Sequence, residues 1–346
     1  MNIEVRQCND YIKETLEIYC RSCNPDSAFK VPVKYVIHIS EDEFADLNKS
    51  KLEYSISITQ LRFAIIDINS KKHLVVVGSS NLLVENDCFT PVFINNVIFL
   101  SIAKSLNLNI REGILEADIL DSIYPIEEEN VGYDVENVAK LFESFMVYEV
   151  PEQEVEREHQ IKTHIAKILL ANQKYLYLPF TSNTINSYVQ YYNKSRYDDN
   201  IFNSSLAYCW RYCFLDVYRC IEPIFRHLPL SGLKQEIGFQ DSIDILYEKI
   251  YNHCGWRPQE TSSMETLFTD QYISEELLQK LRATNIGDSP NENIGKSIYK
   301  LRNKIVHHQG FSANIECLLT EEKWNELIGL LIDSLVELRQ KIPYDS

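Results

Sequence analysis

Hydrophobic residues in the first part of the chain recur at every second position, which is the spacing of β-strands. The alternation runs through residues 31–39 and again through residues 54–58. Residues 61–68 form a more continuous apolar run, which is typical of a strand covered on both faces. The polar residues 69–72 supply a turn before the next apolar run, 73–77, so we expect a hairpin here.

Residues 92–106 pass from a strand-like start at 92–94 into a stretch that is compatible with a helix. Together with the preceding strands, this predicts an α+β domain over residues 1–130 that carries no recognisable chemical motif. We interpret it as a sensor or regulatory domain. Residues 131–200 are expected to be a helical, acidic connecting region, with Pro151 as a joint.

From residue 204 onward the apolar spacing changes to three and four residues, the period of amphipathic helices. Pro223 should break the first of these helices near Glu222. Further helices are expected at 242–252, 274–282 and 293–308, and another after residue 320. Consecutive helices without strands predict a helical bundle over residues 201–346.

The helix expected at 293–308 has two different faces. One carries the apolar residues Ile294, Ile298, Leu301 and Ile305. Nearly opposite lies a polar stripe that consists of Lys296, Lys300, Asn303 and His307 and is bordered by Lys304. Arg302 belongs to neither pattern, because it falls on the side otherwise used for packing. A guanidinium there must reach outward, pair with a carboxylate or face a second protein surface.

The net charge of −16 initially argues against a nucleic-acid-binding protein. However, a net charge of −12 falls within residues 111–158 alone. That stretch is either a solvated linker and helix surface or a mask that imitates nucleic acid. No region is broadly basic, so any contact with RNA must be local.

The run Leu301-Arg302-Asn303-Lys304-Ile305-Val306-His307-His308 resembles the R-N-x-x-x-H signature of HEPN domains, on the penultimate helix of a bundle. Upstream, Tyr218 and Glu222 resemble the tyrosine and glutamate of the first long HEPN helix. The resemblance covers about residues 203–342 and is strongest to the ApeA-like HEPN proteins of bacterial anti-phage defence. It implies an all-α HEPN-type bundle after the α+β domain.

This resemblance implies a metal-independent endoribonuclease without a cofactor, in which a 2′-hydroxyl attacks the adjacent phosphate and leaves a 2′,3′-cyclic phosphate. Arg302 would bind the phosphate, and His307 would transfer the proton, because histidine titrates near neutrality. Asn303 would orient His307 or bind substrate, and Glu222 would hold Arg302 or His307. The flanking phosphates would contact Lys296, Lys300, Lys304 and His308.

HEPN nucleases commonly dimerise with their motifs facing each other, which implies a homodimer. The expected substrate is RNA, with tRNA among the candidates, and the α+β domain would recognise a phage-derived or other protein trigger. Gln309 stands where HEPN toxins silenced by nucleotidyl transfer have a tyrosine, so that form of control is not supported. With no apolar signal core, no membrane-length segment and nine cysteines, we expect a cytoplasmic protein.

Two other readings of the bundle stay open. In the first, the bundle is a scaffold that dimerises or holds RNA without catalysis. In the second, it is the antitoxin or regulatory half of a two-gene system. Growth arrest on expression would distinguish a toxin from both.

Three further motifs each have a functional and a plain structural interpretation. Gly295-Lys296-Ser297 looks like the end of a P-loop, but Pro290 stands where the first glycine is required. Cys20 and Cys23, with Cys8 and His38, are an incomplete zinc pattern. A cluster of tyrosines at 188, 191, 192 and 197 suits either base stacking or packing.

Overall fold

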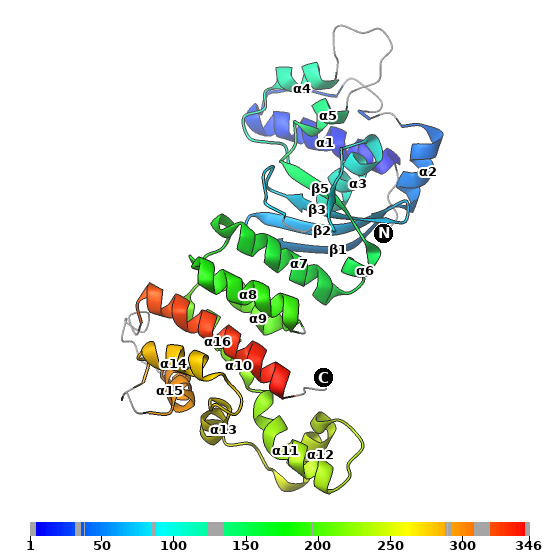
Figure 1. The fold of residues 1–346 in the computed structure, drawn as a ribbon. Coiled ribbons are helices and arrows are strands. Elements are labelled where there is room, and N and C mark those ends of the chain that lie inside the picture. Colours follow the sequence, from blue (N-terminus) through cyan, green and yellow to red (C-terminus); the bar gives the residue numbers. More distant parts are fainter. Residues whose placement is uncertain are drawn as a thin grey trace. The chain divides into compact units, whose positions relative to one another are not determined.

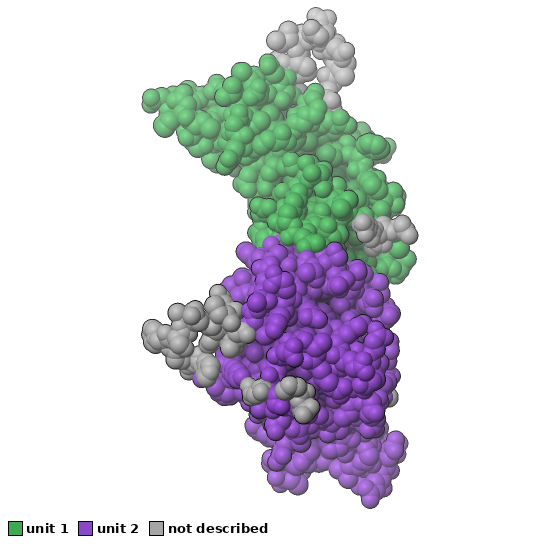
Figure 2. All heavy atoms as spheres, turned by 60° about the vertical axis from the view of Figure 1, so that its left-hand side comes forward, with its two compact units in different colours: residues 1–175 green, residues 176–346 purple. Residues whose placement is uncertain are grey.

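The structure is a computed structural model that describes residues 5–31, 36–37, 39–84, 88–123, 135–195, 197–287, 289, 292–307 and 319–342. It divides into two compact units, Met1–Tyr175 and Leu176–Ser346 (Figure 2). Unit 1 contains an antiparallel sheet with helices, and the described part of unit 2 is built from helices (Figure 1). The predicted order of an α+β region followed by a helical region is therefore confirmed.

In the described part of unit 1, the sheet has five strands in the order β1-β2-β3-β5-β4. Their bounds are β1 Lys51–Ile58, β2 Leu61–Ile68, β3 Lys71–Val77, β4 Thr90–Pro91 and β5 Phe145–Val150. Every pairing is antiparallel. The predicted hairpin is confirmed, and its two turn residues, Asn69 and Ser70, both have positive φ, as a tight hairpin turn requires.

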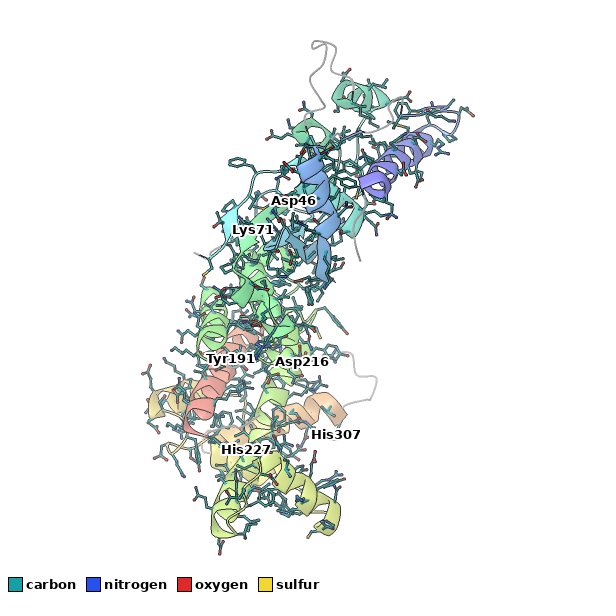
Figure 3. The ribbon with its side chains drawn as sticks, turned by 90° about the vertical axis from the view of Figure 1, so that its right-hand side faces the viewer. Asp46, Lys71, Tyr191, Asp216, His227 and His307 are labelled. Carbon is teal, nitrogen blue, oxygen red and sulfur yellow. The ribbon has the colours of Figure 1, made fainter. Side chains whose placement is uncertain are left out.

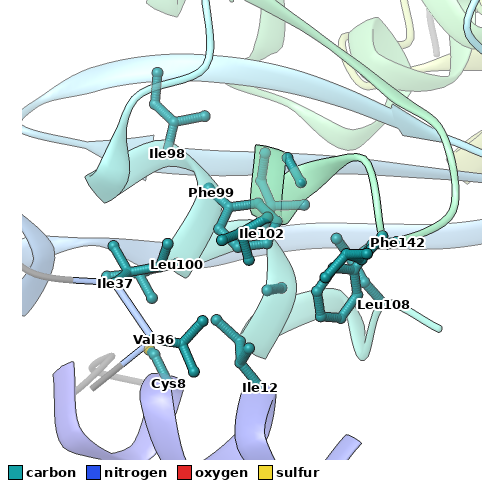
Figure 4. Packing of buried hydrophobic residues seen from close by; sticks show 14 of the residues in the cluster. Cys8, Ile12, Val36, Ile37, Ile98, Phe99, Leu100, Ile102, Leu108 and Phe142 are labelled. Atoms are coloured by element: carbon teal, nitrogen blue, oxygen red, sulfur yellow. The ribbon is translucent and has the colours of Figure 1, made fainter. Parts of the chain in front are cut away.

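Helices cover both faces of this sheet (Figure 1), which explains why β2 is apolar along nearly its whole length. One face packs on α1 (Val5–Cys23), α2 (Glu41–Lys49) and α3 (Asn96–Leu106), where Phe99 and Phe142 meet edge to face at 5.5 Å (Figure 4). On the other face, Phe89 links Tyr148 of β5 to His164 of α7 (Glu158–Ala171).

The remaining helices of unit 1 are α4 Glu116–Ile123, α5 Val135–Ala139, α6 Glu152–Val155 and the short 3-10 helix Gln173–Tyr175. Two details differ from the prediction. The strand expected at 92–94 is β4, two residues earlier, and the region 131–200, expected to be helical, contributes β5 to the sheet. The expected strand at 31–39 falls largely outside the described residues, and so do Glu127–129 of the acidic stretch.

Unit 2 is a helical assembly around α16 (Glu321–Lys341), which packs on α8 (Ser182–Lys194), α10 (Trp210–Ile221) and α14 (Glu275–Ala283). Its other helices are α9 Asp199–Ser205, α11 Ile224–Glu236, α12 Ile243–Cys254, α13 Glu260–Leu267 and α15 Ile294–His307. Trp324 of α16 is buried against Phe214 of α10, with ring centroids 5.9 Å apart.

The predicted helices of unit 2 are confirmed, and Pro223 separates α10 from α11 as expected. The sequence pattern missed α13, whose residues have little helical periodicity. None of the described helices combines the length and apolar character that crossing a bilayer requires.

Candidate functional site

The candidate site lies where α15 packs beside α10. Ile294, Ile298 and Leu301 of α15 are buried, as the apolar stripe predicts, while Ile305 is half-buried. Gly295 makes the close approach of α15 to α13 possible, because a Cβ placed on it would lie 2.1 Å from the carbonyl oxygen of Met264. This packing places one side of α15 beside the end of α10.

Arg302 occupies that side, as its position off the polar stripe suggested. Its Nη2 lies 3.7 Å from Oε1 of Glu222, and its Nη1 donates a hydrogen bond of 3.0 Å to Oδ1 of Asn303. The guanidinium carbon is 5.8 Å from the ring centroid of Tyr218. The Arg302 side chain keeps 21% of its surface exposed, so it is held on one side and open on the other.

The polar groups around Arg302 are partly buried. Burial raises the pKa of Glu222; Arg302 opposes this shift, Glu260 adds to it and Arg219 opposes it. Burial also raises the pKa of Tyr218, and the carboxylates of Glu260 and Glu222 raise it further. Within the described part of the chain, the Tyr218 hydroxyl and Oε2 of Glu260 are buried atoms without a hydrogen-bond partner. Such groups are typical of sites completed by water or a ligand.

The other predicted site residues are distributed unevenly. Asn303 is half-buried and accepts its hydrogen bond from Arg302. His307 is the last residue of α15 and its side chain is exposed (Figure 3). The structure therefore brings Arg302, Asn303 and Glu222 together and leaves His307 open to solvent at the helix end.

The predicted basic ridge is only partly available. Lys300 is paired with Glu292, whose other oxygen accepts a hydrogen bond of 3.1 Å from Ser297. Lys296 and Lys304 are half-buried. His308, with the Gln309 and Gly310 that follow, lies outside the described residues.

A cavity of about 360 Å³ adjoins the site and shares Glu222 with it. Its charged lining includes three arginines that the sequence analysis did not single out, Arg219, Arg226 and Arg257. Arg219 and Arg226 flank Glu222 at −3 and +4, a spacing that could have drawn attention to them. Arg257 arrives from a distant loop, so no local pattern signals it.

The structure gives packing roles to residues of two of the other motifs. Gly295, Lys296 and Ser297 all lie inside α15, not in a phosphate-binding loop, and Gly295 is explained by contact with α13. Tyr188, Tyr191 and Tyr192 are buried, which favours packing over base stacking for these three. No group of three potential metal ligands occurs among the residues described, although His38 is not one of them.

The chain matches no protein-family model, and comparisons with curated proteins and with solved structures found no significant match.

Proposed function

We propose that this protein is a metal-independent endoribonuclease of HEPN type that acts in the cytoplasm as part of a bacterial defence or toxin system. The observation that supports this most is the position of Arg302. In a run with the spacing Arg-Asn-x-x-x-His, this arginine faces Glu222 and Tyr218 of α10 while part of it stays exposed. The substrate is RNA, with tRNA among the candidates, and unit 1 responds to a phage-derived or other protein trigger.

The reaction is an intramolecular transesterification of the RNA phosphodiester. The 2′-hydroxyl oxygen attacks the adjacent phosphorus, the bond to the 5′-oxygen breaks, and the products are a 2′,3′-cyclic phosphate and a 5′-hydroxyl. Arg302 can bind the non-bridging oxygens and stabilise their developing charge. The 2′-hydroxyl loses a proton and the leaving 5′-oxygen gains one. His307 carries out one of these two transfers and water the other, since an imidazole can accept or donate a proton near neutral pH. Glu222 is a positioning residue that keeps the Arg302 guanidinium in place.

The decisive experiment is cleavage of total cellular RNA by purified protein in EDTA. Wild type should cut RNA and leave a 2′,3′-cyclic phosphate, and Arg302→Ala and His307→Ala should each lose at least about 100-fold in rate, the effect typical of removing a group that stabilises transition-state charge. Arg282→Ala is the control, because Arg282 is exposed and paired with Glu275 on α14. Intact RNA with wild-type protein, both in the tube and in cells whose growth its expression arrests, would exclude the nuclease.

The exposed His307 and the half-open Arg302 favour a site completed by a second copy of the chain, so we propose a homodimer through unit 2. Sedimentation of wild type at micromolar concentration should give a dimer of the 40.4 kDa chain. A monomer that is fully active would contradict this arrangement.

The rival function is a module that holds RNA without cutting it, or an antitoxin-type regulator. One observation favours it: Glu222 and Asn303 already engage Arg302. The same cleavage experiment separates the two, because the rival predicts RNA binding without products and no growth arrest that the alanine variants relieve.

A further inference from the structure

The cavity beside Glu222 lies at the junction of three segments of unit 2. Arg219 and Glu222 come from the end of α10, Arg226 from the start of α11, and Arg257 and Glu260 from the loop and helix that follow α12. Tyr247 of α12 completes the polar wall. Its volume of about 360 Å³ is near the lower end of the range for small-ligand sites, roughly 300–1,000 Å³, which suits about one nucleotide rather than a duplex.

Each arginine of the wall is anchored on one side. Arg219 Nη1 is 2.7 Å from Asp216 Oδ1, and Arg226 Nη2 is 2.9 Å from Asp244 Oδ1. Arg257 donates a hydrogen bond to the Tyr251 hydroxyl. Because a guanidinium has five N–H donors, every one of these arginines keeps donors for a ligand. Nε of Arg226 is buried and has no partner among the residues that the structure describes.

Aromatic side chains hold two of these arginines. The guanidinium of Arg226 lies 5.2 Å from the Tyr247 ring, and that of Arg257 lies 4.8 Å from the Tyr251 ring. Tyr247 and Tyr251 stack at 6.1 Å, and Trp256 meets Tyr247 edge to face at 6.3 Å. These contacts hold Arg226 and Arg257 in place before a ligand arrives, which lowers the entropy cost of binding an anion.

The cavity lining carries both arginines and glutamates, which limits the kinds of ligand that it can bind. Arginine forks fit the paired oxygens of a phosphodiester. Glu222 and Glu260 line the same cavity and can accept hydrogen bonds, so the lining suits a ligand that carries both negative charge and hydrogen-bond donors. A ribonucleotide has both kinds of group, since its 2′-hydroxyl and base amines donate and its phosphate is negative.

From these observations we infer that the cavity binds one nucleotide of single-stranded RNA, next to the phosphate held by Arg302. Arg219 and Arg257 contact its phosphates, and Glu260 accepts a hydrogen bond from its 2′-hydroxyl or base. The inference rests on the proposed function for the identity of the ligand. It assigns the main RNA contacts to this arginine wall instead of the lysines of α15.

The test measures binding of a fluorescein-labelled single-stranded RNA octamer in EDTA, in the His307→Ala background so that the probe stays intact. Adding Arg219→Ala or Arg257→Ala should each raise the Kd about tenfold. Each should also reduce the slope of log Kd against log salt by about 0.7, the value for one phosphate contact on a single strand. DNA of the same sequence should bind more weakly, because it lacks the 2′-hydroxyl.

Arg282→Ala is the matched control: like Arg219 it is an exposed helical arginine paired with a carboxylate on its own helix, but it lies on α14. The inference is overturned if Arg219→Ala and Arg257→Ala bind RNA as Arg282→Ala does, or if DNA binds equally well. RNA cleavage by proteins that keep His307 separates the proposed cavity from the proposed nuclease. RNA cutting with arginine-independent binding refutes the cavity alone, and arginine-dependent binding without cutting refutes the nuclease alone.

Discussion

Arg302 on α15 and Glu222 at the end of α10 face each other with 3.7 Å between nitrogen and oxygen, although 80 positions separate them in the chain. Both side chains keep part of their surface exposed, 21% and 36%. At that exposure an ion pair contributes little to stability, about 0–1 kcal/mol. Its main effect is to orient the guanidinium.

Replacing Glu222 with glutamine should therefore affect activity more than stability. We expect RNA cleavage to fall about tenfold, a loss of roughly 1.4 kcal/mol of transition-state stabilisation, while the free energy of unfolding at pH 7 changes by less than about 1 kcal/mol. Single-turnover cleavage and urea unfolding measure the two effects. Glu276→Gln, at an exposed glutamate paired with Lys280, is the control. An unchanged cleavage rate for Glu222→Gln would show that Arg302 needs no such support.

The same variant should alter how stability depends on pH. Burial raises the pKa of Glu222 above its unfolded value. Its contribution is therefore fully present below the unfolded pKa and is lost as pH rises through the folded pKa. Urea unfolding between pH 4 and pH 7 should show this loss in wild type and a smaller one in Glu222→Gln. Identical profiles would contradict the prediction.

Gly295 should be essential for the packing of α15. Alanine there would place a Cβ 2.1 Å from the Met264 carbonyl oxygen, so α15 and α13 must separate. We expect a loss of about 1–3 kcal/mol in the free energy of unfolding, as overpacking typically causes. Gly232→Ala is the control, because Gly232 is a helical glycine of α11 with nothing within 4 Å of an added Cβ. That variant should be neutral or slightly stabilising, and equal effects of the two substitutions would refute the close contact.

Asn325 should be the polar link between α16 and the start of α8. Its Oδ1 accepts a hydrogen bond of 2.8 Å from the Thr181 amide, and its Nδ2 donates one of 3.1 Å to the Pro179 carbonyl. Asn325 is 2% exposed, so alanine would remove both hydrogen bonds from a buried position, at a cost of about 1–3 kcal/mol. Thermal and urea unfolding would measure this. Asn183→Ala, at an exposed position of α8, is the control. If Asn325→Ala lowers the free energy of unfolding no more than Asn183→Ala does, the link is refuted.

His73, buried in β3, should make the sheet of unit 1 sensitive to acid. Burial lowers the pKa of its imidazole, so below the unfolded value of about 6.5 the unfolded chain binds the proton more readily. The contribution of His73 is present above that value and is lost as pH falls through the folded pKa, by up to about 1.4 kcal/mol per pH unit.

Native-state hydrogen exchange of the β2 and β3 amides at pH 7.5, 6.5 and 5.5 would test this, after correction for intrinsic exchange rates. Part of the acid sensitivity should remain in His73→Gln, because burial also lowers the pKa of His164. His159→Gln, at an exposed histidine, should follow the wild type. If hydrogen exchange in His73→Gln depended on pH as it does in wild type, His73 would not be a source of the acid sensitivity.

Local patterns predicted much of the architecture. The period-2 and continuous apolar runs predicted β1 to β3, and the three-and-four spacing predicted most helices of unit 2. Segments with weak periodicity were predicted less well. The pattern of α13 mixes polar and apolar positions, and β5 follows a strongly acidic stretch that resembles a linker.

The sequence by itself determined that Ile294, Ile298 and Leu301 of α15 are buried, where Pro223 interrupts the helices, and that Arg302 stands on the packing side of its helix. These are properties of neighbouring residues, which a helical period expresses directly. Only the tertiary structure decided that Glu222 faces Arg302, one of the two partners expected for it, that Gly295 touches α13, and that Arg257 joins Arg219 in one cavity wall. Those relationships depend on which helices pack together, and packing partners far apart in the chain leave no periodic trace in it.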